Sequence, residues 1–185
     1  TEQVGGEHGG GEQGGFNPLV FFGATQAIFF ALFAANGSAN TVLEEQRDGT
    51  LSRLLQTPTR SGTVLFGKLL GTVIMILLQL LLLFLAFTAI GSLLSGSLTF
   101  IWGRRIGVIL VAVLAAALAS AGVGVITAAV ARQPEQASTI GTIAALFMAV
   151  VGGAFGFQVG PPLAYASVVY WGSRAFTRLA AGEAA

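Results

Sequence analysis

Cysteine is absent from this 185-residue sequence, and histidine occurs once, at position 8. Without thiols the chain has no means of forming a disulfide or supplying a thiolate ligand. A lone histidine among glycines and glutamates is a poor basis for a metal site or a proton relay. The sequence therefore gives no support for redox, cysteine-based or histidine-based chemistry.

Charge is scarce as well: 9% of the residues are charged and 54% are hydrophobic. A soluble domain has roughly 25% charged residues, so this chain has too few polar groups to cover a surface in water. The basic residues are spread over separate loops rather than gathered on one face, which argues against nucleic-acid binding. We predict an all-α integral membrane protein.

Four apolar segments are long enough to cross a bilayer as helices, since about 20 residues span a hydrocarbon core of about 30 Å. We place them at about 16–40, 64–94, 106–131 and 139–157. The third is rich in Ala, Gly and Ser, which favours close helix packing. A tight loop is expected over 132–138, before the fourth.

The two ends of the chain differ from these spans. Residues 1–15 are glycine-rich and polar, and we expect them to be a flexible segment. Residues 158–181 begin near two prolines, are moderately apolar, and contain aromatic and arginine residues. That mixture predicts one or two short helices at the membrane interface or dipping partway into it.

A few polar side chains lie within the predicted spans. Gln26 and Asn36 fall in the first span and Gln79 in the second. Hydrogen bonding between helices is the commoner use of such residues. Contact with a transported substrate is the other interpretation, and the sequence leaves both open.

A charged segment, residues 41–63, separates the first two spans and cannot lie in hydrocarbon, because each unpaired charge there costs several kcal/mol. We expect the first helix to continue to Arg47 and to end near Gly49. Thr50 is expected to cap a short amphipathic helix over 51–56, ended by Pro58. Its leucines share one face at i, i+3 and i+4: Leu51, Leu54 and Leu55.

The positive-inside rule does not orient the chain, because the basic residues are almost evenly divided. On alternate sides the sequence places Arg47, Arg53, Arg60, Lys68 and Arg132 against Arg104, Arg105, Arg174 and Arg178. Lys68, near the start of the second span, is expected to extend its amine to the interface.

Five short motifs follow one another along the charged segment and into the next span: Glu44 and Glu45, Gly49 and Thr50, Leu54 and Leu55, Thr57 and Pro58, and Gly67 and Lys68. In order and spacing they resemble the signature region of type-2 ABC exporter permeases, the membrane subunits of ATP-binding-cassette transporters of the drug, sodium, lipid and polysaccharide export group. The doubled arginine at 104–105 departs from that family, which would place it outside the cell.

The resemblance implies a division of the chain. Residues 1–15 would be the end of an extracytoplasmic segment and 16–185 a permease domain, with a cytoplasmic coupling region at 41–63 and an outer re-entrant hairpin at 158–181. The first and last spans of the family are expected to lie outside this sequence. The residues implied in coupling to an ATPase are Glu44, Glu45, Arg47, Gly49, Thr50, Leu51, Arg53, Leu54, Leu55, Pro58 and Lys68.

The resemblance also implies a mechanism. The chain has no Walker-type Gly-Lys-Ser or Gly-Lys-Thr loop, so we expect no ATPase site and no cofactor on it, with ATP bound by a separate nucleotide-binding subunit. Two permease halves, expected to be identical, would export a hydrophobic or amphiphilic substrate by alternating access across a bacterial or archaeal plasma membrane.

Two other classes remain open. A secondary transporter or channel would be expected to have charged or broken helices in mid-membrane. A structural membrane subunit would use the charged segment only as a solvated loop. Co-purification with a soluble ATPase distinguishes both from the exporter hypothesis.

Overall fold

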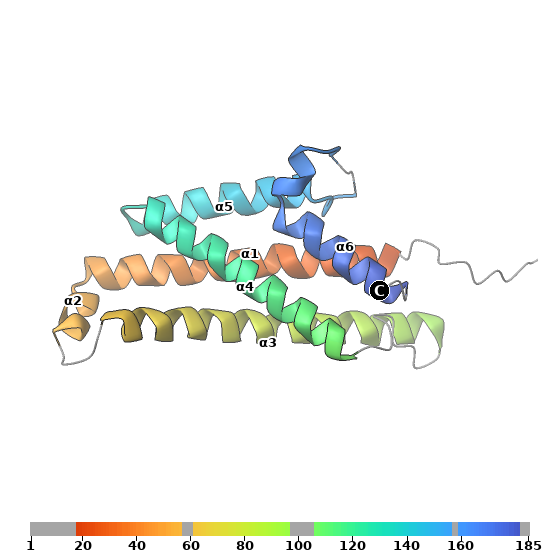
Figure 1. Ribbon diagram of the computed structural model, residues 1–185, viewed down its shortest axis with the longest axis horizontal. Coiled ribbons are helices and arrows are strands. Elements are labelled where there is room, and N and C mark those ends of the chain that lie inside the picture. The colour runs from red at the N-terminus through yellow and green to blue at the C-terminus, as the bar shows by residue number, and fades with distance from the viewer. Residues whose placement is uncertain (1–17, 57–60, 97–105, 157–158, 182–185) are drawn as a thin grey trace, which may run out of the picture.

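The computed structural model describes residues 18–56, 61–96, 106–156 and 159–181, and all its regular elements there are helices. Four are long: α1 (Pro18–Arg47), α3 (Ser61–Ser95), α4 (Ile106–Val130) and α5 (Pro134–Val151). Three are short: α2 (Thr50–Leu55), the 3-10 helix η1 (Leu163–Ala166) and α6 (Val168–Ala180). Figure 1 shows α2 at one end of the bundle, beyond the ends of α1 and α3.

The four long helices have the length and the apolar composition needed to cross a membrane. Their spans agree in order and number with the four segments expected from the sequence. The predicted fold class, an all-α membrane bundle, is therefore confirmed.

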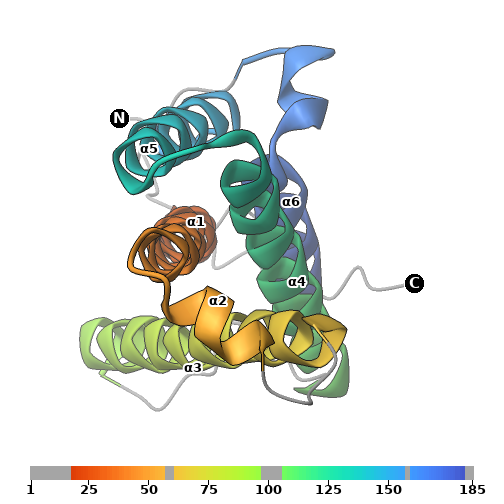
Figure 2. The ribbon, with the colours of Figure 1, turned by 90° about the vertical axis from the view of Figure 1, so that its left-hand side faces the viewer.

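Helix α1 is the centre of the bundle and packs against α3, α4, α5 and α6. Figure 2 shows it between α3 and α5, with α4 and α6 along one side. In its most apolar stretch 56% of the residues are buried, against 22% in α3. A movement of α1 would therefore reach every other long helix, whereas most of α3 faces outward.

Two glycines let neighbouring helices approach α1 closely. A Cβ on Gly124 of α4 would lie 2.6 Å from the carbonyl oxygen of Ala35, and a Cβ on Gly141 of α5 would overlap the amide group of Asn36. Small residues at membrane helix contacts serve this purpose. The small-residue side of α4 is accordingly buried, including Ala117, Ser120 and Ala121.

The ends of α5 differ from the expected ones. The helix starts at Pro134 rather than 139, because proline is well suited to the first helical turn. It ends at Val151 rather than 157, where a turn contains Gly153 and Gly156 with φ of 87° and 88°. The link between α4 and α5 is therefore shorter than the loop expected over 132–138.

The tail after α5 folds back onto the bundle. Helix α6 packs against α1, α4 and α5, and the ring of its buried Phe176 lies 4.8 Å from the ring of Phe84 on α3. On the outer side Tyr165 stacks on Trp171 at 5.6 Å, and both side chains are about half exposed. Two short elements thus occupy the region expected to be interfacial.

Candidate functional site

Gly49 makes the sharp junction between α1 and α2. It has φ 72° and ψ 3°, a left-handed conformation that glycine adopts without steric cost. Its carbonyl accepts the backbone N–H of Arg53 at 3.1 Å. Gly49 is therefore the residue that caps α2, and the expectation that Thr50 caps it is wrong: Thr50 is the first helical residue, and no side chain caps the helix.

Helix α2 lies outside the four spans and contacts both α1 and α3 (Figure 2). Leu51 is half-buried, whereas Leu54 is 40% exposed and Arg53 is exposed. Thr57, Pro58 and Arg60 lie outside the described residues, as does the side chain of Leu55. The described part of α2 thus presents Leu54 and Arg53 to its surroundings, together with the smaller Thr50 and Ser52.

An ion pair joins the end of α1 to α3. The amine of Lys68 donates to the carboxylate of Glu45, and these side chains are only 24% and 28% exposed. Partial burial weakens the screening of such a pair by water and salt. The two residues come from the first and last of the five motifs described above.

A second ion pair joins the end of α1 to the start of α5. Arg47 donates from Nη1 to Glu135 at 3.0 Å, and its Nε lies 3.7 Å from a carboxylate oxygen of Asp48. A small cluster of Leu43, Ala131 and Ala137 is buried at the same end of the bundle. Sequence reasoning missed Glu135, although an acidic residue in the first turn of a helix that begins with proline was the available signal.

Two of the polar side chains within the spans bind backbone carbonyls of neighbouring segments. Gln26 donates from Nε2 to Ala154 at 3.1 Å, and Asn36 donates from Nδ2 to Ser138 at 3.3 Å. Gln79 is half-buried on α3. Both hydrogen bonds attach α1 to α5 or to the turn that follows it.

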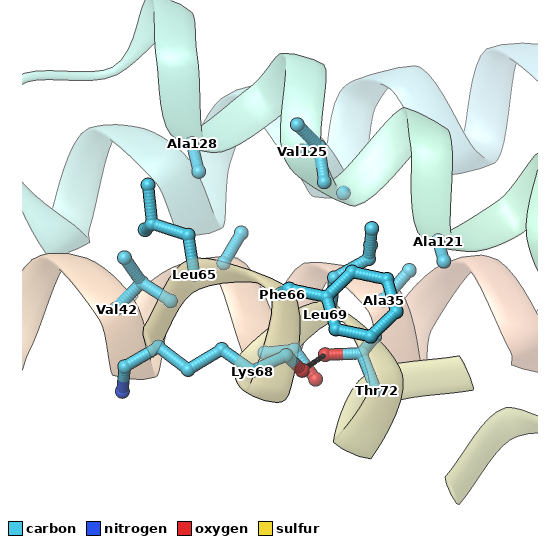
Figure 3. A pocket seen from close by; sticks show the side chains of 13 residues that line it. Ala35, Val42, Leu65, Phe66, Lys68, Leu69, Thr72, Ala121, Val125 and Ala128 are labelled. Carbon is cyan, nitrogen blue, oxygen red and sulfur yellow. Dashed lines mark hydrogen bonds between the residues drawn. The ribbon is translucent and has the colours of Figure 1, made fainter. Parts of the chain in front are cut away.

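A groove lies between α1, α3 and α4, close to the Glu45–Lys68 pair (Figure 3). Its volume is about 410 Å³, and its lining is almost entirely apolar. Among the described residues, no cluster of three or more histidine, aspartate or glutamate side chains is arranged to hold a metal ion.

Four long apolar helices, three of them packed around the fourth, α1, together with a short helix outside the spans, define a multi-pass membrane protein. The family model of the ABC-2 family transporter protein matches residues 9–176, and the chain belongs to this family. The resemblance drawn from the sequence is thereby confirmed, and the chain is an ABC-type permease component, of a family that generally pairs with an ATP-binding subunit. Searches of curated proteins and of solved structures found no significant match.

Proposed function

We propose that this chain is the permease half of an exporter and that α2 is the element through which a separate ATPase subunit moves it. The observation that carries the proposal is the position of α2: it lies outside the spans, follows a left-handed glycine, and contacts the two helices joined by Glu45 and Lys68. Leu54 and Arg53 are the exposed residues suited to a groove on the partner.

The contacts around α2 supply a route for force. A push on α2 reaches α1 through Gly49 and reaches α3 through direct contact and through the Glu45–Lys68 pair. The Arg47–Glu135 pair extends the route to α5. Because α1 packs on every other long helix, its displacement would tilt the permease half as a unit.

Alternating access would follow when two permease halves, proposed to be identical, rock against each other as the ATPase pair closes and opens. The transport path would then run between the halves, beside α1. Two phenylalanines support this position, because Phe22 and Phe30 are 41% and 47% exposed on the most buried of the four helices. The small-residue side of α4 is largely in contact with α1 and is not part of the proposed path.

The distribution of charge favours a hydrophobic or amphiphilic cargo. In the described spans charged residues occur only near helix ends, at 44–47 of α1, at Lys68 of α3 and at Glu135 of α5. Proton relays in pumps and transporters are built from ionisable side chains within the membrane. The proposed setting is the plasma membrane of a bacterium or archaeon, as the resemblance implies.

The experiment compares two substitutions that each introduce a negative charge on the same short helix. Leu54→Asp places a carboxylate where the partner groove is proposed, and Ser52→Asp places one on another exposed position of α2. Each full-length subunit is reconstituted in vesicles with its candidate ATPase, and export and ATP hydrolysis are measured. Leu54→Asp should lose export and binding of the ATPase, while Ser52→Asp keeps both. Equal activity of the two variants would contradict the proposal.

A further inference from the structure

Apart from Lys68, the residues that line the groove between α1, α3 and α4 have no part in the proposed coupling mechanism. Its volume of about 410 Å³ falls in the range of roughly 300–1,000 Å³ found for ligand sites. Apart from Ser38, Thr72 and Lys68, its lining is apolar, and the Thr72 hydroxyl is directed into its own helix, where it donates to the Lys68 carbonyl at 3.0 Å. The groove therefore suits a hydrocarbon chain better than a polar ligand.

The groove is open at the surface of the chain. Leu65, Phe66 and Val125 on its walls are 53%, 64% and 52% exposed. These residues belong to two helices that are long and apolar enough to span the membrane. The opening therefore faces the surroundings of the spans, where acyl chains are the solvent.

Lys68 gives the groove a polar end. Figure 3 shows its side chain extending from α3 toward the end of the groove where Val42 and Leu65 lie. The amine contacts the carboxylate of Glu45, but an ammonium group has three donors and retains capacity for a second acceptor. The Glu45–Lys68 pair thus forms the polar end of an otherwise apolar groove, and its ammonium group has a donor for a phosphate attached to an acyl chain while it stays paired with Glu45.

We propose that this groove binds a phospholipid from the leaflet on the α2 side, with part of one acyl chain between the helices and its phosphate at Lys68. Along α4 the lining runs from Ala121 to Ala128, about 10 Å at 1.5 Å per residue, which accommodates a segment of one chain. The proposal goes beyond the coupling function, because a resident lipid would occupy the site whether or not the ATPase partner is bound.

The test uses the full-length protein in phosphatidylcholine vesicles containing a small fraction of phosphatidylglycerol with a photoreactive diazirine in its acyl chain. After irradiation, labelled peptides are mapped by mass spectrometry. Ala128→Phe fills the groove, and Ala129→Phe is the matched control, because Ala129 is exposed and lies outside the lining. Val125→Trp is a second blocking variant at the half-exposed mouth, where no repacking of the bundle is needed.

The wild type should be labelled at 35–42 of α1 and 121–128 of α4. Both blocking variants should lower this labelling by about tenfold, and Ala129→Phe should leave it unchanged. Labelling of the groove no stronger than that of the exposed side of α3, for example at Leu82, would show ordinary surrounding lipid and overturn the proposal. Loss of labelling in dimeric protein would show that a second copy covers the groove, and this would also overturn the proposal.

A second arm tests the phosphate. The same acyl chains are offered as diazirine-labelled diacylglycerol, which lacks phosphate, to the wild type and to Lys68→Gln. The wild type should favour the phospholipid in the groove, and Lys68→Gln should label equally with both lipids. Equal labelling of the wild type by both lipids would show that Lys68 does not bind the phosphate and would overturn the proposed headgroup contact.

Discussion

Lys68 on α3 and Glu45 on α1 form an ion pair across 23 positions of the sequence, with both side chains mostly shielded from solvent. The pair lies where the spanning part of each helix gives way to the charged segment. It is the polar link between α3, which α2 contacts, and α1, the helix at the centre of the bundle.

Removing one partner of this pair should destabilise the protein. Glu45→Gln leaves the Lys68 amine without its carboxylate in a partly buried place, and we expect the free energy of unfolding to fall by about 1–2 kcal/mol. Arg47→Ala, which breaks a pair whose side chains are 57% and 70% exposed, should cost less than about 1 kcal/mol.

Denaturant titration of the purified variants measures both values. In a double-mutant cycle with Lys68→Gln, the double variant should lose less stability than the sum of the losses of the two single variants. A coupling energy of zero would mean that the pair does not hold α1 and α3 together.

The contact of α4 with α1 at Gly124 can be tested with a matched pair of substitutions. Gly124→Ala would bring a methyl group to 2.6 Å from the Ala35 carbonyl oxygen, a backbone atom that cannot move aside. We expect a loss of about 1–3 kcal/mol from this overpacking. Gly122→Ala on the same helix meets nothing within 4 Å and should be neutral or gain up to about 1 kcal/mol.

Thermal unfolding of the two alanine variants provides the comparison. Equal midpoints would show that α4 and α1 are not in close contact at this position. A lower midpoint for Gly122→Ala than for Gly124→Ala would contradict the packing described here even more directly.

At the contact of α5 with α1, two destabilising substitutions should partly compensate for each other. Gly141→Ala alone should destabilise, because its methyl group overlaps the Asn36 side chain. Asn36→Ala alone should also destabilise, since it removes a buried side chain that donates to Ser138. In the double variant the new methyl group enters the space that Asn36 leaves. The loss of stability should therefore be smaller than the sum of the losses in the two single variants. Additive losses would refute the contact.

Helix type and order were predictable because long uncharged segments leave no alternative to membrane helices. The extension of α1 to Arg47 and the break at Gly49 also followed from the local sequence. Glycine rather than Thr50 caps α2, because the left-handed conformation of Gly49 makes the turn by itself. The start of α5 at Pro134 was missed, since a proline between polar residues fits a loop as well as a helix start.

The contacts of the candidate site were less accessible from the sequence. Arg47 and Glu135 are 88 positions apart, and their pairing depends on the ends of α1 and α5 lying side by side. The groove likewise depends on how three helices pack, which their individual patterns do not determine. Motif order indicated where the site lies, but only the packing of α1 shows which residues meet there.

The most direct measurement for the coupling role of α2 is cross-linking from position 54. Because residues 1–185 contain no cysteine, Leu54→Cys provides the one thiol within them for a short photoreactive reagent, and any cysteine elsewhere in the full-length subunit is replaced by serine. Leu82→Cys, 68% exposed on α3, is the control within the membrane. In membranes containing the candidate ATPase, we predict a cross-linked product from position 54 and none from position 82. No product from position 54, or the same amount from both, would contradict the assignment of α2 as the coupling helix.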